Sequence, residues 1–308
     1  MNLAIPDVRT LEIHPPPPAN LTTSCRRSSG PSGRNDLGVP LLLGAIRDAA
    51  ALGYNFLSIA GEPALFHPSL PSLCREAHRM GMLTTVTTRG VLLSVRRLKA
   101  IIHSVDLLGV RFEAGIEPSL QAVRRLGIPF AVVYPLSPAN MGEMEAAATF
   151  AAANGAAMLN VRPDGELSDQ QMATVWMMIE CLRDMHRGEL AVQLEVLNRY
   201  HLPIDAGDLD GWRAGLQTDT RFLGELISPL VVEQDGTVSP LRRGFPRSLA
   251  LGNLRNATLA ELAATWIHGG AAAFCRIYRA VLRDARFFGD LPQLLAKHAG
   301  GASFSAAG

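Results

Sequence analysis

Short runs rich in β-branched and apolar residues alternate along this chain with longer stretches of helical periodicity. This alternation is typical of parallel strands joined by crossover helices. The expected strands span residues 11–14, 55–59, 83–87, 107–112, 130–134, 157–161 and 191–197, and the expected helices span 41–52, 70–80, 94–102, 118–126, 141–154 and 168–186. About six such units are too many for a small doubly wound sheet and fewer than the eight of a closed barrel. The pattern therefore predicts an α/β fold built as a partial (β/α)6-type open barrel.

The pattern changes after about Gly207. Residues 229–233 and 237–239 flank the dipeptide Asp235-Gly236, which is a strong short-range signal for a β-hairpin. Two helical patterns follow, over residues 259–268 and 272–284. We therefore expect a barrel over residues 1–206, an extension of a hairpin plus helices over 207–298, and a flexible Gly/Ala/Ser tail over 299–308.

The charge balance argues against two classes of partner. Lysine and arginine number 29 against 28 acidic residues, so the net charge of the 308 residues is only +1. Such a chain has no global field that would attract nucleic acid or an anionic membrane. We expect neither as a partner. With 48% hydrophobic residues the chain can instead bury a full core.

Cysteine usage indicates the compartment. Cys25, Cys74, Cys181 and Cys275 are widely scattered and form no CxxC pair, which favours unpaired thiols in a reducing environment. The first ten residues lack a basic-then-apolar signal pattern, and no stretch approaches the roughly 18 uncharged apolar residues of a membrane span. The sequence therefore predicts a cytoplasmic protein.

In a barrel of this kind the chemistry lies at the carboxyl ends of the strands. The first such end is the loop 15–31, which begins with four prolines and continues as Ala19-Asn20-Leu21-Thr22-Thr23-Ser24-Cys25. The strand and loop resemble the opening of radical S-adenosylmethionine (SAM) proteins, where a first strand enters a CNLxCxxC loop. In that family three thiolates hold a 4Fe-4S cluster, and the open fourth iron binds SAM. The resemblance implies that an electron from the cluster cleaves SAM to a 5′-deoxyadenosyl radical.

This chain departs from the family pattern at the cluster ligands. Ala19 stands where the first cysteine is expected and Thr23 where the second is expected, and Cys25 matches the third only if one residue is deleted. One thiolate with a methyl and a hydroxyl group is not a cluster site, so a 4Fe-4S cluster is not expected from this chain alone. Cys25 is the candidate metal ligand and equally an ordinary loop thiol. His14 is a weaker candidate, because a histidine at a strand end is more often structural.

Two further turns resemble family motifs that contact SAM. Ala60-Gly61-Glu62-Pro63 after the second strand is similar to GGEP, and Thr87-Thr88-Arg89-Gly90 after the third is similar to TTNG with arginine in place of asparagine. The resemblance implies SAM contacts from Gly61, Glu62, Pro63, Thr88 and Arg89. Taken alone, Gly-Glu-Pro is an ordinary βα turn.

The C-terminal segment also resembles part of the family. Asp235-Gly236-Thr237-Val238, then Leu251-Gly252-Asn253-Leu254, then a helix ending at Trp266 occur in the order found in the SPASM or twitch-type extension of peptide- and small-molecule-maturing members. Where those members place a cysteine for an auxiliary cluster, this chain has Leu241. No auxiliary cluster is therefore implied.

Three hypotheses for the function remain open. The first is a pseudoenzyme of the radical SAM fold that has lost two of three cluster cysteines and serves as a binding or partner subunit, for a paralogous radical SAM enzyme or a peptide. The second is an active radical SAM enzyme with non-standard or partner-supplied ligands. The third is a cluster-free barrel that binds SAM or a small molecule, with Glu62 and Glu113 as strand-end carboxylates suited to acid-base work.

Overall fold

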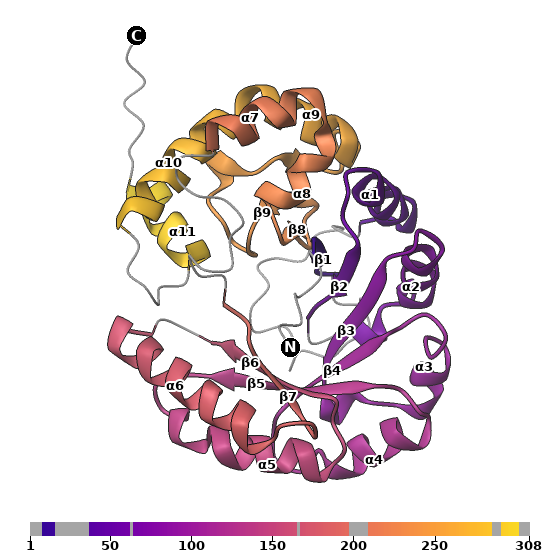
Figure 1. Cartoon of the computed structure of the whole chain (residues 1–308). Coiled ribbons are helices and arrows are strands. Elements are labelled where there is room, and N and C mark those ends of the chain that lie inside the picture. The colour runs from indigo at the N-terminus through magenta and orange to yellow at the C-terminus, as the bar shows by residue number, and fades with distance from the viewer. Residues whose placement is uncertain are drawn as a thin grey trace. The chain divides into compact units, whose positions relative to one another are not determined.

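The structure is a computed structural model of the whole chain, and it describes residues 8–15, 37–61, 64–164, 167–196, 209–284 and 291–301. The chain divides into two compact units (Figure 1). The central unit comprises residues 14–36 and 57–196, and the terminal unit comprises residues 1–13, 37–56 and 197–308. The division expected from the sequence, at residues 206 and 298, stays a prediction.

The central unit contains a sheet with the strand order β2-β3-β4-β5-β6-β7. The strands are β2 (Phe56–Ile59, of which Phe56 belongs to the terminal unit), β3 (Leu83–Arg89), β4 (Leu107–Arg111), β5 (Phe130–Leu136), β6 (Met158–Pro163) and β7 (Ala191–Leu194). Each pair from β3 to β7 is parallel. The α/β class with a parallel sheet, predicted from the alternating pattern, is thereby confirmed.

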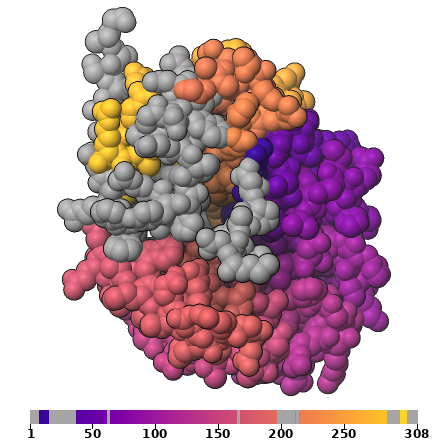
Figure 2. Space-filling model, in the orientation of Figure 1, coloured from indigo at the N-terminus to yellow at the C-terminus, as the bar shows by residue number. Residues whose placement is uncertain are grey.

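Helices connect successive strands of this sheet. They are α2 (Leu70–Arg79), α3 (Val95–Lys99), α4 (Glu117–Arg125), α5 (Met144–Ala153) and α6 (Asp169–Met185), with the short 3-10 helices η2 (Ala64–Phe66), η3 (Gly90–Leu92) and η4 (Met141–Glu143). Helix α6 begins at a capping box in which Ser168 and Gln171 each accept a hydrogen bond from the other's backbone N–H. Figure 1 shows α2 to α6 along one side of the strands, and Figure 2 shows their side chains as a continuous surface from purple through magenta to salmon.

The two faces of the central sheet differ in burial along β3, β6 and β7, whereas β5 is buried on both faces. On β3, Thr84, Val86 and Thr88 are buried while the residues between them are partly exposed, and β7 alternates in the same way. The buried set faces the helices, because side chains alternate between the faces of a strand. We call the opposite side the inner face. In register it carries Thr85, Thr87 and Arg89 on β3, Leu107, Gly109 and Arg111 on β4, Ala131, Val133 and Pro135 on β5, Met158, Asn160 and Arg162 on β6, and Ala191 and Gln193 on β7, with Glu195 just beyond it.

Strand β7 is the last strand in the order of the central sheet. Its main chain is contacted from the helix that precedes it, because the Nε–H of Arg183 on α6 donates a 2.9 Å hydrogen bond to the carbonyl oxygen of Val192. Arg183 also forms an ion pair with Glu180 one turn earlier on the same helix. An arginine side chain thus occupies one of the acceptors of an edge strand.

The terminal unit contains the strand order β10-β9-β8-β1. The strands are β1 (Thr10–Ile13), β8 (Leu230–Val232), β9 (Thr237–Pro240) and β10 (Gly252–Asn253). β1 and β8 are parallel, whereas β8, β9 and β10 are antiparallel. The hairpin predicted at Asp235-Gly236 is present: Val232 pairs with Val238, and Gly236 takes the φ of +90° that the turn requires.

The DGTV and LGNL motifs of the sequence form one structure. Gly252 pairs with Val238 and Asn253 pairs with Thr237, so the second motif adds a third strand to the hairpin of the first. The backbone N–H of Leu254 donates to the carbonyl oxygen of Gly236 at 2.9 Å. Their ordered appearance in the sequence therefore has a physical basis in strand pairing.

Helices complete the terminal unit. They are α1 (Val39–Ala51), α7 (Leu209–Thr218), α8 (Leu223–Leu226), α9 (Leu259–Gly269), α10 (Ala271–Asp284) and α11 (Leu291–Gly301). α9 begins at a second capping box, between Thr258 and Glu261. Between α9 and α10 lies an aromatic cluster of Phe245, Trp266, Phe274 and Tyr278, with ring centroids 5.6 to 6.4 Å apart. These rings are buried and dominate the core of this unit.

The structure differs from the sequence prediction at the end of β3 and in three additional helices. Strand β3 continues to Arg89, two residues beyond its predicted end at Thr87, so Thr88 and Arg89 are strand residues rather than loop residues. Helices α7, α8 and α11 were missed. Helix α8 has only four residues, which is too short for a periodic pattern.

Candidate functional site

The first predicted contact, Gly61, lies two residues after the end of β2. Its φ is +122°, and its carbonyl oxygen accepts a 3.1 Å hydrogen bond from the N–H of Ala64. A residue with a side chain rarely adopts this backbone conformation, so glycine is required for the turn. Glu62 and Pro63 lie outside the described residues.

The extra length of β3 separates the next two predicted contacts. Thr88 is 2% exposed and lies on the helix-covered face, where its hydroxyl is 3.4 Å from the carbonyl oxygen of Arg89. The alternation of the strand places Arg89 on the inner face. Of the two, Arg89 is the one at the carboxyl end of the strand with a side chain on the polar side of the sheet.

Arg89 is held by Glu113, the carboxylate that follows β4. Its Nε and Nη2 atoms donate to Glu113 Oε2 at 3.0 and 2.8 Å, and Oε1 of the same carboxylate accepts from the backbone N–H of Val91 at 3.3 Å. The Glu113 side chain is 19% exposed. Sequence reasoning named both residues but did not pair them. Glu113 therefore forms an ion pair with Arg89 and is not an isolated carboxylate available for acid-base catalysis.

Two more ion pairs lie at the carboxyl ends of the central strands. Arg111 at the end of β4 contacts Asp164, which follows β6, with 3.1 Å between Nη2 and Oδ2. Arg162 on β6 contacts Glu195, which follows β7, with 2.6 Å between Nη2 and Oε1, and the other oxygen of Glu195 accepts from Asn160 Nδ2 at 2.7 Å. These residues were missed from the sequence. The available signal was a charged residue at or just after the end of each predicted strand.

The inner face becomes more polar toward these carboxyl ends. One register row reads Thr87, Gly109, Ala131, Met158 and Ala191, and the next reads Arg89, Arg111, Val133, Asn160 and Gln193. The first row is also tightly packed at its centre. A Cβ atom added to Gly109 would lie 2.9 Å from Thr87 Oγ1 and 3.2 Å from a methyl carbon of Val133. One row of this face therefore carries mostly small side chains, and the three arginine-carboxylate pairs lie in the rows beyond it, nearer the carboxyl ends of the strands.

The thiols of the described residues do not fit a 4Fe-4S cluster. Cys74 lies buried on α2, Cys181 is exposed on α6 and Cys275 is buried on α10. Burial raises the pKa of Cys74 to about 12, which disfavours the thiolate that ligates iron. Among the described residues no group of three His, Cys, Asp or Glu side chains is placed to hold a metal ion.

The loop that resembles the cluster-binding motif lies outside the described residues, with Ala19, Thr23 and Cys25. The sequence nevertheless shows that residues 15–36 contain a single cysteine. Three thiolates from one loop, the donor set that the resemblance implies, are therefore not available in this chain. The residues present therefore do not fit a 4Fe-4S cluster.

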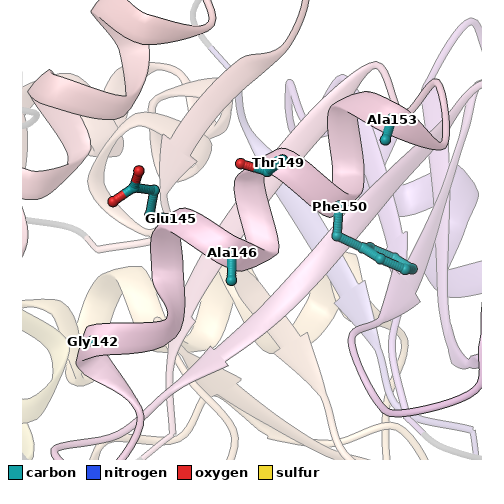
Figure 3. Close-up of a pocket in the computed structure, with 6 residues that line it drawn as sticks. All are labelled: Gly142, Glu145, Ala146, Thr149, Phe150 and Ala153. Carbon is teal, nitrogen blue, oxygen red and sulfur yellow. The ribbon is translucent and has the colours of Figure 1, made fainter.

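An open groove lies elsewhere in the central unit, along α5. Figure 3 shows the six lining residues spaced along η4 and α5: Gly142, Glu145, Ala146, Thr149, Phe150 and Ala153. Most of them are exposed, whereas the residues of α5 between them are buried against the unit. The groove therefore lies on a helix surface, apart from the strand-end ion pairs.

No described helix is long and apolar enough to cross a membrane.

No protein-family model matches this chain, and neither does any curated protein sequence. Solved structures do match. SuiB of Streptococcus suis bound to S-adenosylmethionine superposes with a TM-score of 0.63 at 12% identity over 88% of this chain and 68% of that chain. SuiB bound to its precursor peptide SuiA gives 0.63 at 11% identity, covering 93% and 76%. The structure of anSMEcpe with AdoMet and the Kp18Cys peptide gives 0.58 at 13% identity, covering 94% and 95%.

These likenesses concern the fold. At 11 to 13% identity they confirm the fold class expected from the sequence, an α/β fold built as a partial βα-barrel.

Proposed function

We propose that this chain is a radical SAM-fold pseudoenzyme that holds no 4Fe-4S cluster and acts by binding a peptide, either free or as a segment of a partner protein. The observation that carries the proposal is the donor set: one cysteine in the loop, and the other three on separate helices. A site-bound cluster needs several thiolates converging on one place.

The inner face supports a binding role. Its strand ends present arginine, carboxylate and amide groups, which are the groups that recognise peptides through charge and hydrogen bonds. Two of the solved structures with this fold contain peptides, SuiA and Kp18Cys. A peptide is therefore the ligand class that we favour.

Anaerobic reconstitution with iron and sulfide tests the absence of a cluster. We expect iron well below the roughly four atoms per chain of a complete cluster, no SAM-responsive EPR signal and no 5′-deoxyadenosine under reduction. Cys25→Ala serves as the matched variant and should leave the small residual iron content unchanged. Stoichiometric iron together with SAM cleavage would establish the active-enzyme alternative instead.

A second candidate function is binding of SAM without cleavage. It is favoured by Gly61 beyond the end of β2. Gly61 has a positive φ and no side chain, so a ligand can approach its main-chain groups closely. Calorimetric titration with SAM separates the two candidates. A saturable heat with a stoichiometry near one supports the second candidate, and we expect Gly61→Val to abolish it. For the peptide-binding proposal alone we expect no saturable heat.

A further inference from the structure

Arg89 and Arg111 are register partners on the neighbouring strands β3 and β4. Both lie on the inner face at the carboxyl ends of their strands. Like charges directly opposite on adjacent strands destabilise a sheet unless anions compensate them. The pair therefore forms a place where negative charge is stabilised, and in this structure Glu113 and Asp164 supply that charge.

The two compensating contacts are unequal. Glu113 makes two hydrogen bonds to Arg89 and one to a backbone N–H, and its side chain is 19% exposed. Asp164 makes a single contact of 3.1 Å to Arg111, with side chains that are 63% and 42% exposed. Exposed single ion pairs contribute little to stability, because water screens them and both side chains lose conformational freedom. Arg111 can therefore exchange Asp164 for another anion at little cost, whereas Arg89 stays with Glu113.

The position of the Arg111 contact adds a second observation. Arg111 belongs to β4 and Asp164 follows β6, so the ion pair passes over the inner face at the end of β5, the strand between them. A ligand lying across the carboxyl ends of the central strands has to meet this contact. An arginine guanidinium binds a carboxylate with two parallel hydrogen bonds, which the single contact to Asp164 does not use.

We propose that Arg111 anchors a carboxylate of the bound peptide, from an acidic side chain or the C-terminus, and that Asp164 occupies Arg111 until this carboxylate displaces it. The inference rests on the proposed peptide-binding function and names its anchor. Arg111 then touches the ligand, while Asp164 acts as an internal competitor.

This competition predicts that Arg111→Gln weakens peptide binding whereas Asp164→Asn strengthens it. Peptides are selected from a random library on the full chain, and the affinity of the tightest one is measured by fluorescence anisotropy. We expect Arg111→Gln to weaken binding at least about tenfold, because it removes a hydrogen bond between two charged groups, which is stronger than one between neutral groups. We expect Asp164→Asn to strengthen binding up to about fivefold, since it removes a competing ion pair of at most about 1 kcal/mol.

The same contact can also be removed by changing the peptide instead of the protein. Replacing the anchoring carboxylate of the peptide by an amide should weaken binding to the wild-type chain about tenfold, and should add little further loss in Arg111→Gln, as expected for two partners of one contact. Arg111→Lys keeps the charge but not the planar fork, so an intermediate loss is expected. Arg125→Gln, on the exposed side of α4, removes the same charge elsewhere and should leave binding unchanged.

Two results would overturn the inference: wild-type affinity in Arg111→Gln, or weaker binding in Asp164→Asn. In either case the peptide still binds, so the proposed function stands. A selection that yields no binding peptide at all would instead contradict the proposed function.

Discussion

Replacing Phe274 by alanine is expected to lower the free energy of unfolding of the terminal unit by about 3–5 kcal/mol, the usual cost of removing a buried aromatic ring. Phe274 has no exposed surface, and its ring lies 5.6 Å from the rings of Trp266 and Tyr278 and 6.4 Å from that of Phe245. Removing the ring would leave a cavity at the centre of this aromatic cluster. Thermal unfolding followed by near-ultraviolet circular dichroism measures the loss.

Substitution of Tyr278, in the same cluster, is a control that is not expected to lower the free energy of unfolding. Its hydroxyl group is buried and has no hydrogen-bond partner among the described residues, and burial raises the pKa of the phenol. Tyr278→Phe removes this unsatisfied group while keeping the ring, so the stability should rise by about 1 kcal/mol or stay unchanged. A loss in Phe274→Ala no greater than that of Val91→Ala, which truncates an exposed side chain, would contradict the assigned core.

Glu233→Ala is expected to cost about 2–4 kcal/mol of unfolding free energy. The Glu233 carboxylate is 6% exposed and accepts hydrogen bonds from Ser239 Oγ at 2.5 Å, the N–H of Gly244 at 3.2 Å and Arg247 Nη2 at 3.0 Å. Removing it leaves the fully buried Ser239 hydroxyl and a backbone N–H without this acceptor, and each such loss costs about 1–3 kcal/mol. Urea unfolding monitored by tryptophan fluorescence gives the difference.

The neighbouring Asp235 is the matched control. It contacts the same Arg247 at 3.1 Å, but its side chain is 47% exposed. Burial raises the pKa of Asp235, yet the hydrogen bonds from Thr237 and the charge of Arg247 outweigh it, so the net pKa lies below the usual value. The exposed ion pair itself contributes about 1 kcal/mol or less. Equal losses for Asp235→Ala and Glu233→Ala would contradict the difference that burial predicts.

The fold was accessible from the sequence where local signals are strong. The alternation of strand and helix patterns gave the parallel central sheet, and Asp235-Gly236 gave the hairpin, because both depend on residues close in sequence. The end of β3 was placed two residues early, since threonine and arginine carry no clear stop signal. That small error matters, because it assigned Thr88 and Arg89 to one loop although they lie on opposite faces of a strand.

The candidate site was only partly accessible. Arg89 and Glu113 were both noted, yet their contact joins residues 24 positions apart and depends on the register of β3 and β4. Arg111 and Asp164 are 53 positions apart and meet across β5, which no periodicity could indicate. The predicted SAM contacts of Gly61, Thr88 and Arg89 stay predictions. Glu62, Pro63 and Cys25 lie outside the described residues.

The contact between Arg183 and Val192 bears on how the chain behaves at high concentration. An edge strand with unpaired main-chain groups is a template on which another copy can add a strand, the first step toward ordered aggregates. Because Arg183 occupies the carbonyl oxygen of Val192 and sets a positive charge beside β7, a second copy would have to displace a charged side chain to pair there. Within the described part of the chain, one arginine on α6 thus makes edge-to-edge pairing of copies at β7 less favourable.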